Sequence, residues 1–466
     1  MKSLIVLYDD SRKPNVTVRS ITGNKSFGDT IFKRQTLFER MRDIFLGFEC
    51  VSDCILIKAE DVTAALTGSN DAILLFYSNY AISNREELEV IARKACFAHE
   101  PYRVVCNGQV ACLIFENATM YRECISENPN SYTAIDTQCL IDLSDGSNFR
   151  QFITSGFEAR FFNALSGDEY TVVKKSANKE KLRREYTFYS LLPEDMKQWF
   201  VRPFDYTESE NESSYKMKRY HMTDLAIRYV HGAIEKDEFN SILENLFYFI
   251  GKRKSKNVTV EEYEDTATKL YVTKVKGRVA TLKENEDYAG IENLIIETTP
   301  YGGIDEIVER YIVLYNKIRE GRKFMNVAVV GHGDLCFSNI LYNDDARLLM
   351  LIDPKGALSE DELYMDPYYD IAKLSHSICG CYDFFNSGLF EIGMDERLKC
   401  ELSIDNNNAC YVEAFKEFLA RNGLDYKLIR LYEASLFLSM LPLHMDRPKK
   451  VFAFILNAIN IMDEIE

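Results

Sequence analysis

Apolar residues in the first third of the chain occur either in short continuous runs or at a spacing of three to four residues. The runs predict buried strands, and the wider spacing predicts helices that bury one face. The expected strands are Leu4–Leu7, Ala72–Tyr77, Arg103–Cys106 and Ala111–Phe115, and the expected helices are Thr36–Phe48 and Arg85–Cys96, the second opened by a cap at Ser83 and Asn84. This alternation predicts a parallel sheet covered on both faces, an α/β domain over residues 1–145.

A different pattern begins near Phe149. Three strand-like segments follow one another, joined by short turns that contain glycine: Phe149–Thr154, Glu158–Leu165 and Tyr170–Ser176. Consecutive strands with tight turns predict an antiparallel meander. The next segment, Lys179–Leu192, has one apolar stripe at helical spacing, and Tyr215–Met217 is a further expected strand. Residues 146–222 therefore predict a small α+β unit.

Residues 223–466 have mostly helical spacing, interrupted by a compact strand-loop-strand segment at Val327–Asp353. Within it, His332, Gly333 and Asp334 follow one apolar strand, and four residues separate Asp334 from Asn339. A second apolar strand then ends at Asp353. Polar residues thus collect at a loop and at a strand end.

Composition and charge limit the partners that the chain can have. A formal charge of −16 disfavours an extended nucleic-acid footprint, which depends on clustered Lys and Arg. No stretch approaches the apolar length of a membrane span, and the first apolar run is too short for a signal peptide. The twelve cysteines are scattered, as is typical of free thiols in a reducing compartment. We therefore expect a cytoplasmic protein that does not bind nucleic acid.

The spacing of the polar residues suits phosphoryl transfer. That reaction needs a carboxylate aimed at the acceptor hydroxyl, and oxygen ligands that hold Mg²⁺ on the nucleotide phosphates. Asp334 is the candidate for the carboxylate that orients the hydroxyl and accepts its proton. Asn339 and Asp353 offer hard oxygen atoms to the metal, and His332 packs the loop. Chance occurrence is the alternative, and the apolar strand that ends in Asp just downstream disfavours it.

This segment resembles the signature of the aminoglycoside phosphotransferase and choline/ethanolamine kinase family, His-Gly-Asp, four residues, Asn and then Ile-Asp. Asp370-Ile-Ala is similar to the family's Asp-Leu-Ala helix start, whose Asp is usually structural. The resemblance extends from near residue 150 to the end of the chain. It implies a bilobal protein-kinase-like fold that uses ATP and Mg, with an N-lobe at 146–222, a C-lobe at 223–466 and a catalytic loop at 331–353.

A kinase also needs a cation on the nucleotide phosphates, fixed by a carboxylate on the following helix. Lys174 and Lys175 end one predicted strand, and Glu185 lies near the start of the next helix. Both lysines are candidates, and Lys175 is preferred because the family-like pattern places Lys directly before a small polar residue such as Ser176. A basic strand end that faces water is the alternative.

The resemblance implies further contacts to ATP and leaves the acceptor open. Ser155 and Gly156 occupy the turn where such kinases place the loop over the phosphates, although a plain hairpin is the alternative. Met217 falls where the hinge between the lobes would meet adenine. His444 and Asp446 at the start of a late helix are candidate acceptor contacts, as are the three cations within residues 274–278. Surface or core packing is the alternative for both groups.

Residues 1–145 resemble a degenerate sugar-phosphate nucleotidyltransferase domain, which is Rossmann-like. That family carries a Gly-rich loop, whereas Arg12, Lys13 and Pro14 stand here without glycine. Asn79 stands where the family has a metal-binding Asp. We therefore expect a module without nucleotidyl transfer activity that docks against the kinase, pairs with a second copy or positions a biosynthetic partner. Together the two modules resemble bacterial capsular or surface-polysaccharide biosynthesis proteins.

The leading hypothesis is an ATP- and Mg-dependent kinase that phosphorylates a hydroxyl of a sugar, polyol or amino alcohol. A bifunctional nucleotidyltransferase-kinase is one alternative, and the missing Gly-rich loop counts against it. A non-catalytic pseudokinase scaffold is another, and the intact set of Asp334, Asn339 and Asp353 counts against it. The acceptor stays open, because its pocket is built from helices scattered along the C-terminal half.

Overall fold

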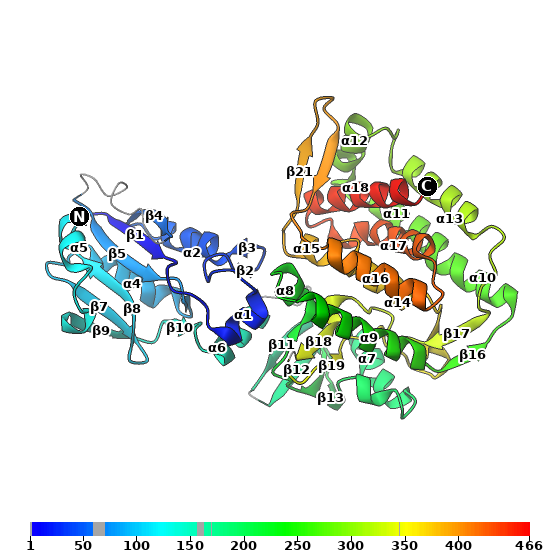
Figure 1. Cartoon of the computed structure of the whole chain (residues 1–466), viewed down its shortest axis with the longest axis horizontal. Helices are drawn as coiled ribbons and strands as arrows, with labels where there is room; N and C mark the ends of the chain where they lie inside the picture. Colours follow the sequence, from blue (N-terminus) through cyan, green and yellow to red (C-terminus); the bar gives the residue numbers. More distant parts are fainter. Residues whose placement is uncertain (1, 59–69, 156–162, 169, 344) are drawn as a thin grey trace. The chain divides into compact units, whose positions relative to one another are not determined.

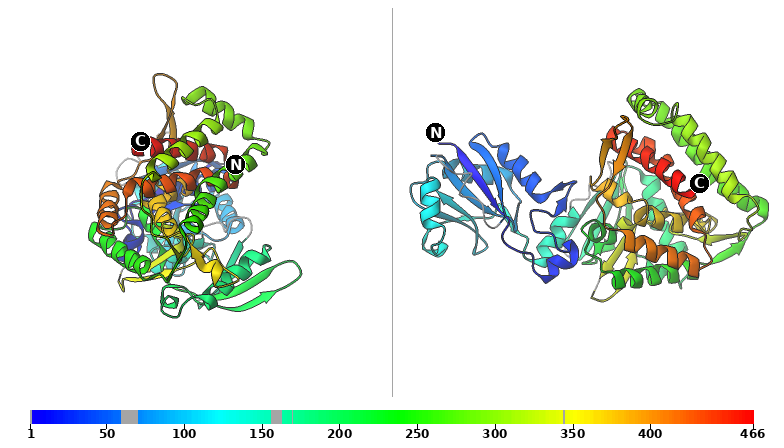
Figure 2. Two further views of the ribbon diagram at one scale, coloured as in Figure 1. Left: turned by 90° about the vertical axis from the view of Figure 1, so that its right-hand side faces the viewer. Right: turned by 45° about the horizontal axis from the view of Figure 1, so that its top comes forward.

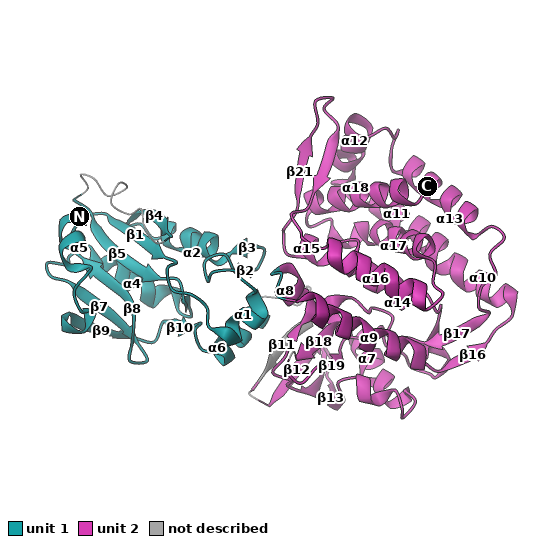
Figure 3. Cartoon of the chain, in the orientation of Figure 1, with its two compact units in different colours: residues 1–158, 231–233 teal, residues 159–230, 234–466 magenta. Residues whose placement is uncertain are grey.

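The computed structural model describes residues 2–58, 70–155, 163–168, 170–343 and 345–466. The chain divides into two compact units (Figure 3): Met1–Glu158 with His231–Ala233, and Ala159–Val230 with Ile234–Glu466. Each unit has a hydrophobic core of its own. Within the described ranges no helix is both long and apolar enough to span a bilayer.

The first unit is built on a six-stranded sheet with the order β4-β1-β5-β8-β7-β9 (Figure 1). Its strands are β1 (Leu4–Asp9), β4 (Val51–Ile57), β5 (Ala72–Tyr77), β7 (Tyr102–Cys106), β8 (Gln109–Phe115) and β9 (Thr133–Thr137). The predicted helices are confirmed as α2 (Leu37–Leu46) and α4 (Arg85–Ala95). Side chains of Thr36 and Asn84 cap them by accepting backbone N–H bonds, which fixes where each helix begins.

The expectation of a wholly parallel sheet is wrong at β8. This strand runs antiparallel to both β5 and β7, whereas β1 pairs in parallel with β4 and β5. Asn107 and Gly108 join β7 to β8 with φ values of 49° and 78°. Two consecutive left-handed residues are what a two-residue hairpin turn requires, and Asn-Gly adopts them readily. The chain therefore folds straight back instead of crossing over.

The predicted strand Phe149–Thr154 is wrong as well, because this segment is helix α6 (Gly146–Ser155) of the first unit. Asp145 caps it by accepting from the N–H groups of Ser147 and Asn148 at 2.9 and 2.8 Å. Phe149 packs near Phe27, and Phe152 stacks on Phe32 with ring centroids 4.1 Å apart. The apolar residues of this segment have helical spacing, and these contacts cover the face of α6 on which they lie.

The second unit opens with a four-stranded antiparallel sheet of order β11-β12-β14-β13. Its strands are β11 (Asn163–Gly167), β12 (Thr171–Ser176), β13 (Pro203–Glu208) and β14 (Ser213–Lys218). Helix α7 (Lys179–Leu191) packs against β13 and β14. The predictions of strands at Tyr170–Ser176 and Tyr215–Met217 and of the helix between them are confirmed. The expected strand Glu158–Leu165 overlaps β11 in its second half, and residues 158–162 lie outside the described ranges.

Helices make up most of the rest of this unit: α8 (Leu225–Val230), α9 (Lys236–Lys252), α10 (Val260–Thr268), α11 (Lys274–Lys283), α12 (Tyr288–Thr298), α13 (Ile304–Arg319), α14 (Tyr369–Ile378), α15 (Tyr382–Asn386), α16 (Ala409–Arg421), α17 (Tyr426–Met440) and α18 (Pro448–Ile465). Figure 2 shows the stack that they form. Helix α17 is buried from Leu428 to Met440 and contacts α11, α13, α14, α16 and α18. It is therefore the centre of the core.

The predicted strand-loop-strand segment is confirmed. Strand β17 (Val327–Val330) leads into a loop, the short turn η4 (Phe337–Asn339) and then the hairpin of β18 (Ile340–Asn343) and β19 (Leu348–Leu351). A bond from the N–H of Ile352 to the carbonyl of Asn339, 3.0 Å long, ties the end of β19 to the loop. The polar residues of the loop after β17 and those that follow β19 are thus held side by side.

Candidate functional site

The loop after β17 is anchored by the buried carboxylate of Asp370, in the first turn of α14. The N–H groups of His332 and Gly333 donate to its two oxygens at 2.9 and 2.8 Å. Arg253 of α9's C-terminal end forms a buried ion pair with the same carboxylate at 3.2 Å. Buried carboxylates persist where such donors satisfy them. Asp370 therefore fixes the position of the loop, and Arg253 is a supporting residue that the sequence did not point to.

His332 is completely buried inside the loop. Its Nδ1 accepts from the N–H of Asp334 at 3.1 Å, and its Nε2 lies 2.8 Å from the carbonyl oxygen of Ile352. Because a carbonyl only accepts, Nε2 carries the proton. The ring also stacks on Phe200. His332 thus links the backbone of Asp334 to the backbone of Ile352, the residue before Asp353.

The turn at position 333 accommodates glycine more easily than any other residue type. The φ of Gly333 is +80°, and an added Cβ would lie 2.6 Å from Cβ of Lys355. The left-handed backbone and the close approach both favour glycine. The backbone then turns so that the next residue, Asp334, leaves the loop with 43 % of its side chain exposed.

Asn339 and Lys373 hold the carboxylate of Asp334 from two sides, and Sγ of Cys336 lies 4.0 Å from its Oδ1. Nδ2 of Asn339 lies 3.1 Å from Oδ2 and also donates to the backbone carbonyl of Asp334 at 2.8 Å. Nζ of Lys373, on α14, lies 2.9 Å from Oδ1. The sequence interpretation brought Asp334 and Asn339 together and missed Lys373. The sequence does contain an indication of Lys373, because this residue follows Asp370 by three positions on one helix and so lies on the same face.

A second carboxylate–lysine group joins the sheet to β19. Nζ of Lys174 on β12 lies 2.6 Å from Glu185 of α7 and 2.9 Å from Oδ1 of Asp353. The side chain of Lys174 is 2 % exposed, whereas that of Lys175 is 44 % exposed and pairs with Glu212 at 3.6 Å. The preference for Lys175 is therefore wrong: alternation along β12 turns Lys174 toward Glu185 and Lys175 toward solvent.

Charges in this group support one another. Burial opposes the charge on Lys174, but Asp353 and its other acidic neighbours outweigh burial and hold the pKa of Lys174 above its ordinary value. Burial raises the pKa of Glu185, and Lys174 opposes that rise. Tyr215 donates to Glu185 at 3.1 Å. The ammonium of Lys174 is thus a fixed and buried positive charge between Glu185 and Asp353.

Asn339 and Asp353 fit the requirements of Mg²⁺. Both amide hydrogen bonds of Asn339 come from its nitrogen, so its oxygen is left as an acceptor. Asp353 directs only Oδ1 to Lys174 and is 39 % exposed. Among the described residues no set of three or more His, Cys, Asp or Glu side chains forms a metal cage. Mg²⁺ needs none when one or two carboxylates and substrate phosphates bind it together.

A small cleft opens beside Asp353 and Glu185. Its other walls are mainly apolar and come from the sheet, α7 and β19: Phe188, Val201, Pro203, Met217, Leu351 and Ile352. Met217 therefore lies where a ligand in the cleft would touch it.

The remaining predicted residues lie in other surroundings. Ser155 ends α6 of the first unit, and Gly156 is outside the described residues. His444 packs edge-on to Phe454, and the exposed Asp446 pairs with Arg447 at 3.5 Å. The strand expected before Ser155 is thus a helix, and the predicted phosphate loop from Gly156 onward lies outside the described residues.

In the first unit, Arg12 occupies the carboxyl end of the parallel strands. Its guanidinium lies 3.4 Å from the ring centre of Tyr77 and donates to Oδ1 of Asn79 at 3.1 Å. The amide nitrogen of Asn79 donates to Asp142 and Ser144. Because protein groups already use both ends of this amide, Asn79 is poorly suited to bind a metal.

The chain has distant structural similarity to several solved proteins. No protein-family model matches the sequence, and no curated protein matches it significantly. Among solved structures, a thermostable mutant of aminoglycoside phosphotransferase APH(4)-Ia aligns at 11 % identity and a TM-score of 0.40, covering 65 % of this chain and 94 % of its own. An aminoglycoside-3'-phosphotransferase of type VIII aligns at 13 % and 0.34, covering 61 % and 97 %. A protein assigned as a fructosamine-3-kinase from Haemophilus somnus 129PT aligns at 11 % and 0.37, covering 65 % and 90 %.

Proposed function

We propose that the second unit is a kinase that uses ATP and Mg²⁺ to phosphorylate a hydroxyl of a small molecule. One observation carries the proposal: Lys174, paired with Glu185, bonds Asp353, which lies beside the loop that presents Asp334 and Asn339. These residues come from segments far apart in the sequence. Phosphoryl transfer needs this combination of a phosphate-binding cation, oxygen ligands for a metal and a carboxylate for the acceptor.

Each residue has a role that follows from its surroundings. Lys174 donates to the nucleotide phosphates, and Glu185 keeps its ammonium in place. Asn339 and Asp353 hold Mg²⁺, which when bound neutralises charge on the phosphate oxygens. The apolar cleft with Met217 receives the base of the nucleotide. Asp334 lies on the acceptor side with its carboxylate partly exposed.

The reaction is a direct transfer. The acceptor oxygen forms a bond to the γ-phosphorus as the bond from that phosphorus to the β,γ-bridging oxygen breaks. The proton of the acceptor hydroxyl passes to the carboxylate of Asp334. The products are the phosphate ester and ADP. His332 and Asp370 do not meet the substrates and instead keep the loop in shape.

The acceptor that we propose is a sugar, polyol or amino alcohol used for a surface glycan, as the resemblance of the two-module chain implies. The first unit then acts as a docking module for the kinase, a second copy or a biosynthetic partner. Arg12, seated on Tyr77 and bonded to Asn79, counts against a bifunctional enzyme, because it fills the end of the sheet where that chemistry would take place.

The test is a screen of the purified full chain with Mg·ATP against sugars, polyols and amino alcohols, with phosphorylated product detected by mass spectrometry. Asp334→Asn should lower kcat by about 10² or more and leave ATP affinity nearly unchanged, since it removes the proton acceptor but no nucleotide contact. Product formation by the Asn variant at the parental rate would contradict the assignment. Failure of the parent to consume ATP with any acceptor would contradict the function itself.

A further inference from the structure

The roles above leave the ion pair between Lys373 and Asp334 without a function. Lys373 lies one turn beyond Asp370 on α14, with Nζ 2.9 Å from Oδ1 of Asp334 and only 12 % of its side chain exposed. An exposed pair of this kind contributes little to stability. This pair differs, because its cation is nearly removed from water and its anion is the carboxylate that faces the acceptor.

The charge on Lys373 persists despite its burial. Burial opposes that charge, but Asp334, with smaller contributions from Tyr369 and Cys336, outweighs it and holds the pKa of Lys373 above its ordinary value. Placing an ammonium out of water is costly unless an anion accompanies it. The chain thus keeps a charged group where an apolar side chain would pack more easily, which calls for a reason other than stability.

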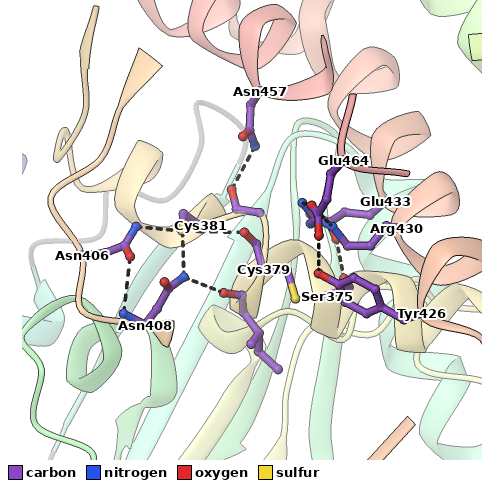
Figure 4. Close-up of polar contacts among 12 residues, drawn as sticks. Ser375, Cys379, Cys381, Asn406, Asn408, Tyr426, Arg430, Glu433, Asn457 and Glu464 are labelled. Carbon is purple, nitrogen blue, oxygen red and sulfur yellow. Dashed lines mark hydrogen bonds and ion pairs between the residues drawn. The ribbon is translucent and has the colours of Figure 1, made fainter. Parts of the chain in front are cut away.

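The helix that carries Lys373 is firmly anchored. Ser375 donates to the buried carboxylate of Glu433 on α17. Arg430 bonds Glu433 at 2.5 Å and Glu464 of α18 at 2.8 Å (Figure 4). At its other end α14 is held by the bonds of Asp370 to the loop. Lys373 sits between these two attachments, so its backbone position is fixed relative to Asp334.

The carboxylate of Asp334 is consequently held at both oxygens. Lys373 contacts Oδ1, and Asn339 donates to Oδ2. A carboxylate with a single donor can turn about its terminal bond, whereas two donors from different elements select one orientation. The carboxylate of Asp334 then has a defined orientation.

We propose that Lys373 is a positioning residue for phosphoryl transfer, which fixes the carboxylate of Asp334 toward the acceptor hydroxyl. The inference rests on the proposed kinase function. Reacting groups that are misplaced by about 1 Å lose about 10²-fold in rate. Lys373 acts through Asp334, so its removal should slow the chemical step and leave nucleotide binding intact.

The experiment compares the parent chain with Lys373→Met, which keeps the length of the side chain, and Lys373→Arg, which keeps the charge. ADP release from Mg·ATP is measured with water, or with the acceptor that gives product in the screen. We expect the Met variant to lose about 10²-fold in kcat with the KM for ATP within about 2-fold, and the Arg variant to recover part of the loss. The control is Lys416→Met, which removes a cation from an exposed pair with Glu413 on α16 and should match the parent.

The outcomes separate the two levels of the proposal. An active parent with an equally active Lys373→Met variant, or a variant with raised KM and unchanged kcat, would overturn the role of Lys373 alone. A parent that releases no ADP with any acceptor of the screen would remove the kinase function and this inference with it. If the Met variant does not fold, the Arg variant decides, since parental kcat despite the altered geometry would rule out positioning.

Discussion

Carboxylates of the second unit have contrasting surroundings. Asp334 and Asp353 each bond a lysine and keep part of their surface in contact with solvent. Asp383, at the start of α15, is almost fully buried. Burial raises the pKa of Asp383 to about 7, with Asp334 adding to the rise and Lys450 and Ser377 opposing it. The same residue type therefore serves as a lysine-paired site group in two places and as a weak acid in the third.

This difference predicts a pH dependence of stability. A carboxyl group whose pKa is about 7 when folded and 3.8 when unfolded binds more protons in the folded state between these values. Stability then falls as pH rises from about 4 to about 7. Asp383→Asn cannot ionise and should lose this part of the slope. Urea unfolding of parent and variant at a series of pH values checks the prediction, and parallel curves would contradict it.

Among secondary-structure elements, the hairpin of β7 and β8 depends on its turn. Gly108 has a φ of +78°, and no atom lies within 4 Å of an added Cβ among the described residues. A substitution there changes backbone strain and nothing else nearby. The turn is thus a clean place to measure what left-handed backbone contributes to the first unit.

Gly108→Ala should lower the stability of the first unit by about 1 to 2 kcal/mol, the cost of a left-handed conformation in a residue with Cβ. The control is Gly290→Ala in α12, which also has open space around it but helical backbone. That change should stabilise by up to about 1 kcal/mol. Thermal melts of both variants test the pair, and a loss of stability of the same size in both would sink the explanation.

Local signals explain which elements the sequence predicted. The simple apolar patterns of β5 and α7 predict both elements, whereas the prediction of a strand at Phe149–Thr154 overlooks the helical spacing of Phe149, Phe152 and Ile153 in α6. The side of β12 that Lys174 occupies was undecidable, because valines precede both lysines. The contact of Lys174 with Asp353 spans 179 residues. Apolar periodicity predicts local secondary structure, but it does not predict which residues far apart in the sequence come into contact.

At the scale of the whole molecule, α6 belongs to the first unit. Phe149 and Phe152 of α6 pack on Phe27 and Phe32, so the unit extends beyond residue 145. The nucleotidyltransferase resemblance of this unit remains a prediction. Protein groups occupy the amide of Asn79, and Arg12 lies at the same end of the sheet. Both observations support the prediction that the first unit does not transfer nucleotides.

We expect a fragment of residues 1–155 to fold cooperatively and to be more stable than residues 1–145, because the shorter one exposes the apolar surface that α6 covers. Neither fragment should release pyrophosphate from a nucleoside triphosphate and a sugar or alcohol phosphate. Circular dichroism melts and a pyrophosphate assay provide the measurements. Equal melting temperatures would contradict the role of α6, and pyrophosphate release would favour a bifunctional enzyme.

Asp353 has a φ of 56°, in the left-handed region that residues other than glycine seldom adopt. Selection for stability and selection for turnover should favour different residues at this position. Gly and Ala both remove the carboxylate, but only Gly relieves the backbone, so Asp353→Gly should exceed Asp353→Ala in stability by about 1 kcal/mol. A library selected for heat resistance alone should therefore enrich Gly over Ala at 353, and every such clone should have lost turnover. Selection for turnover would restore Asp, which makes this residue a marker for telling working copies of the gene from those that have drifted.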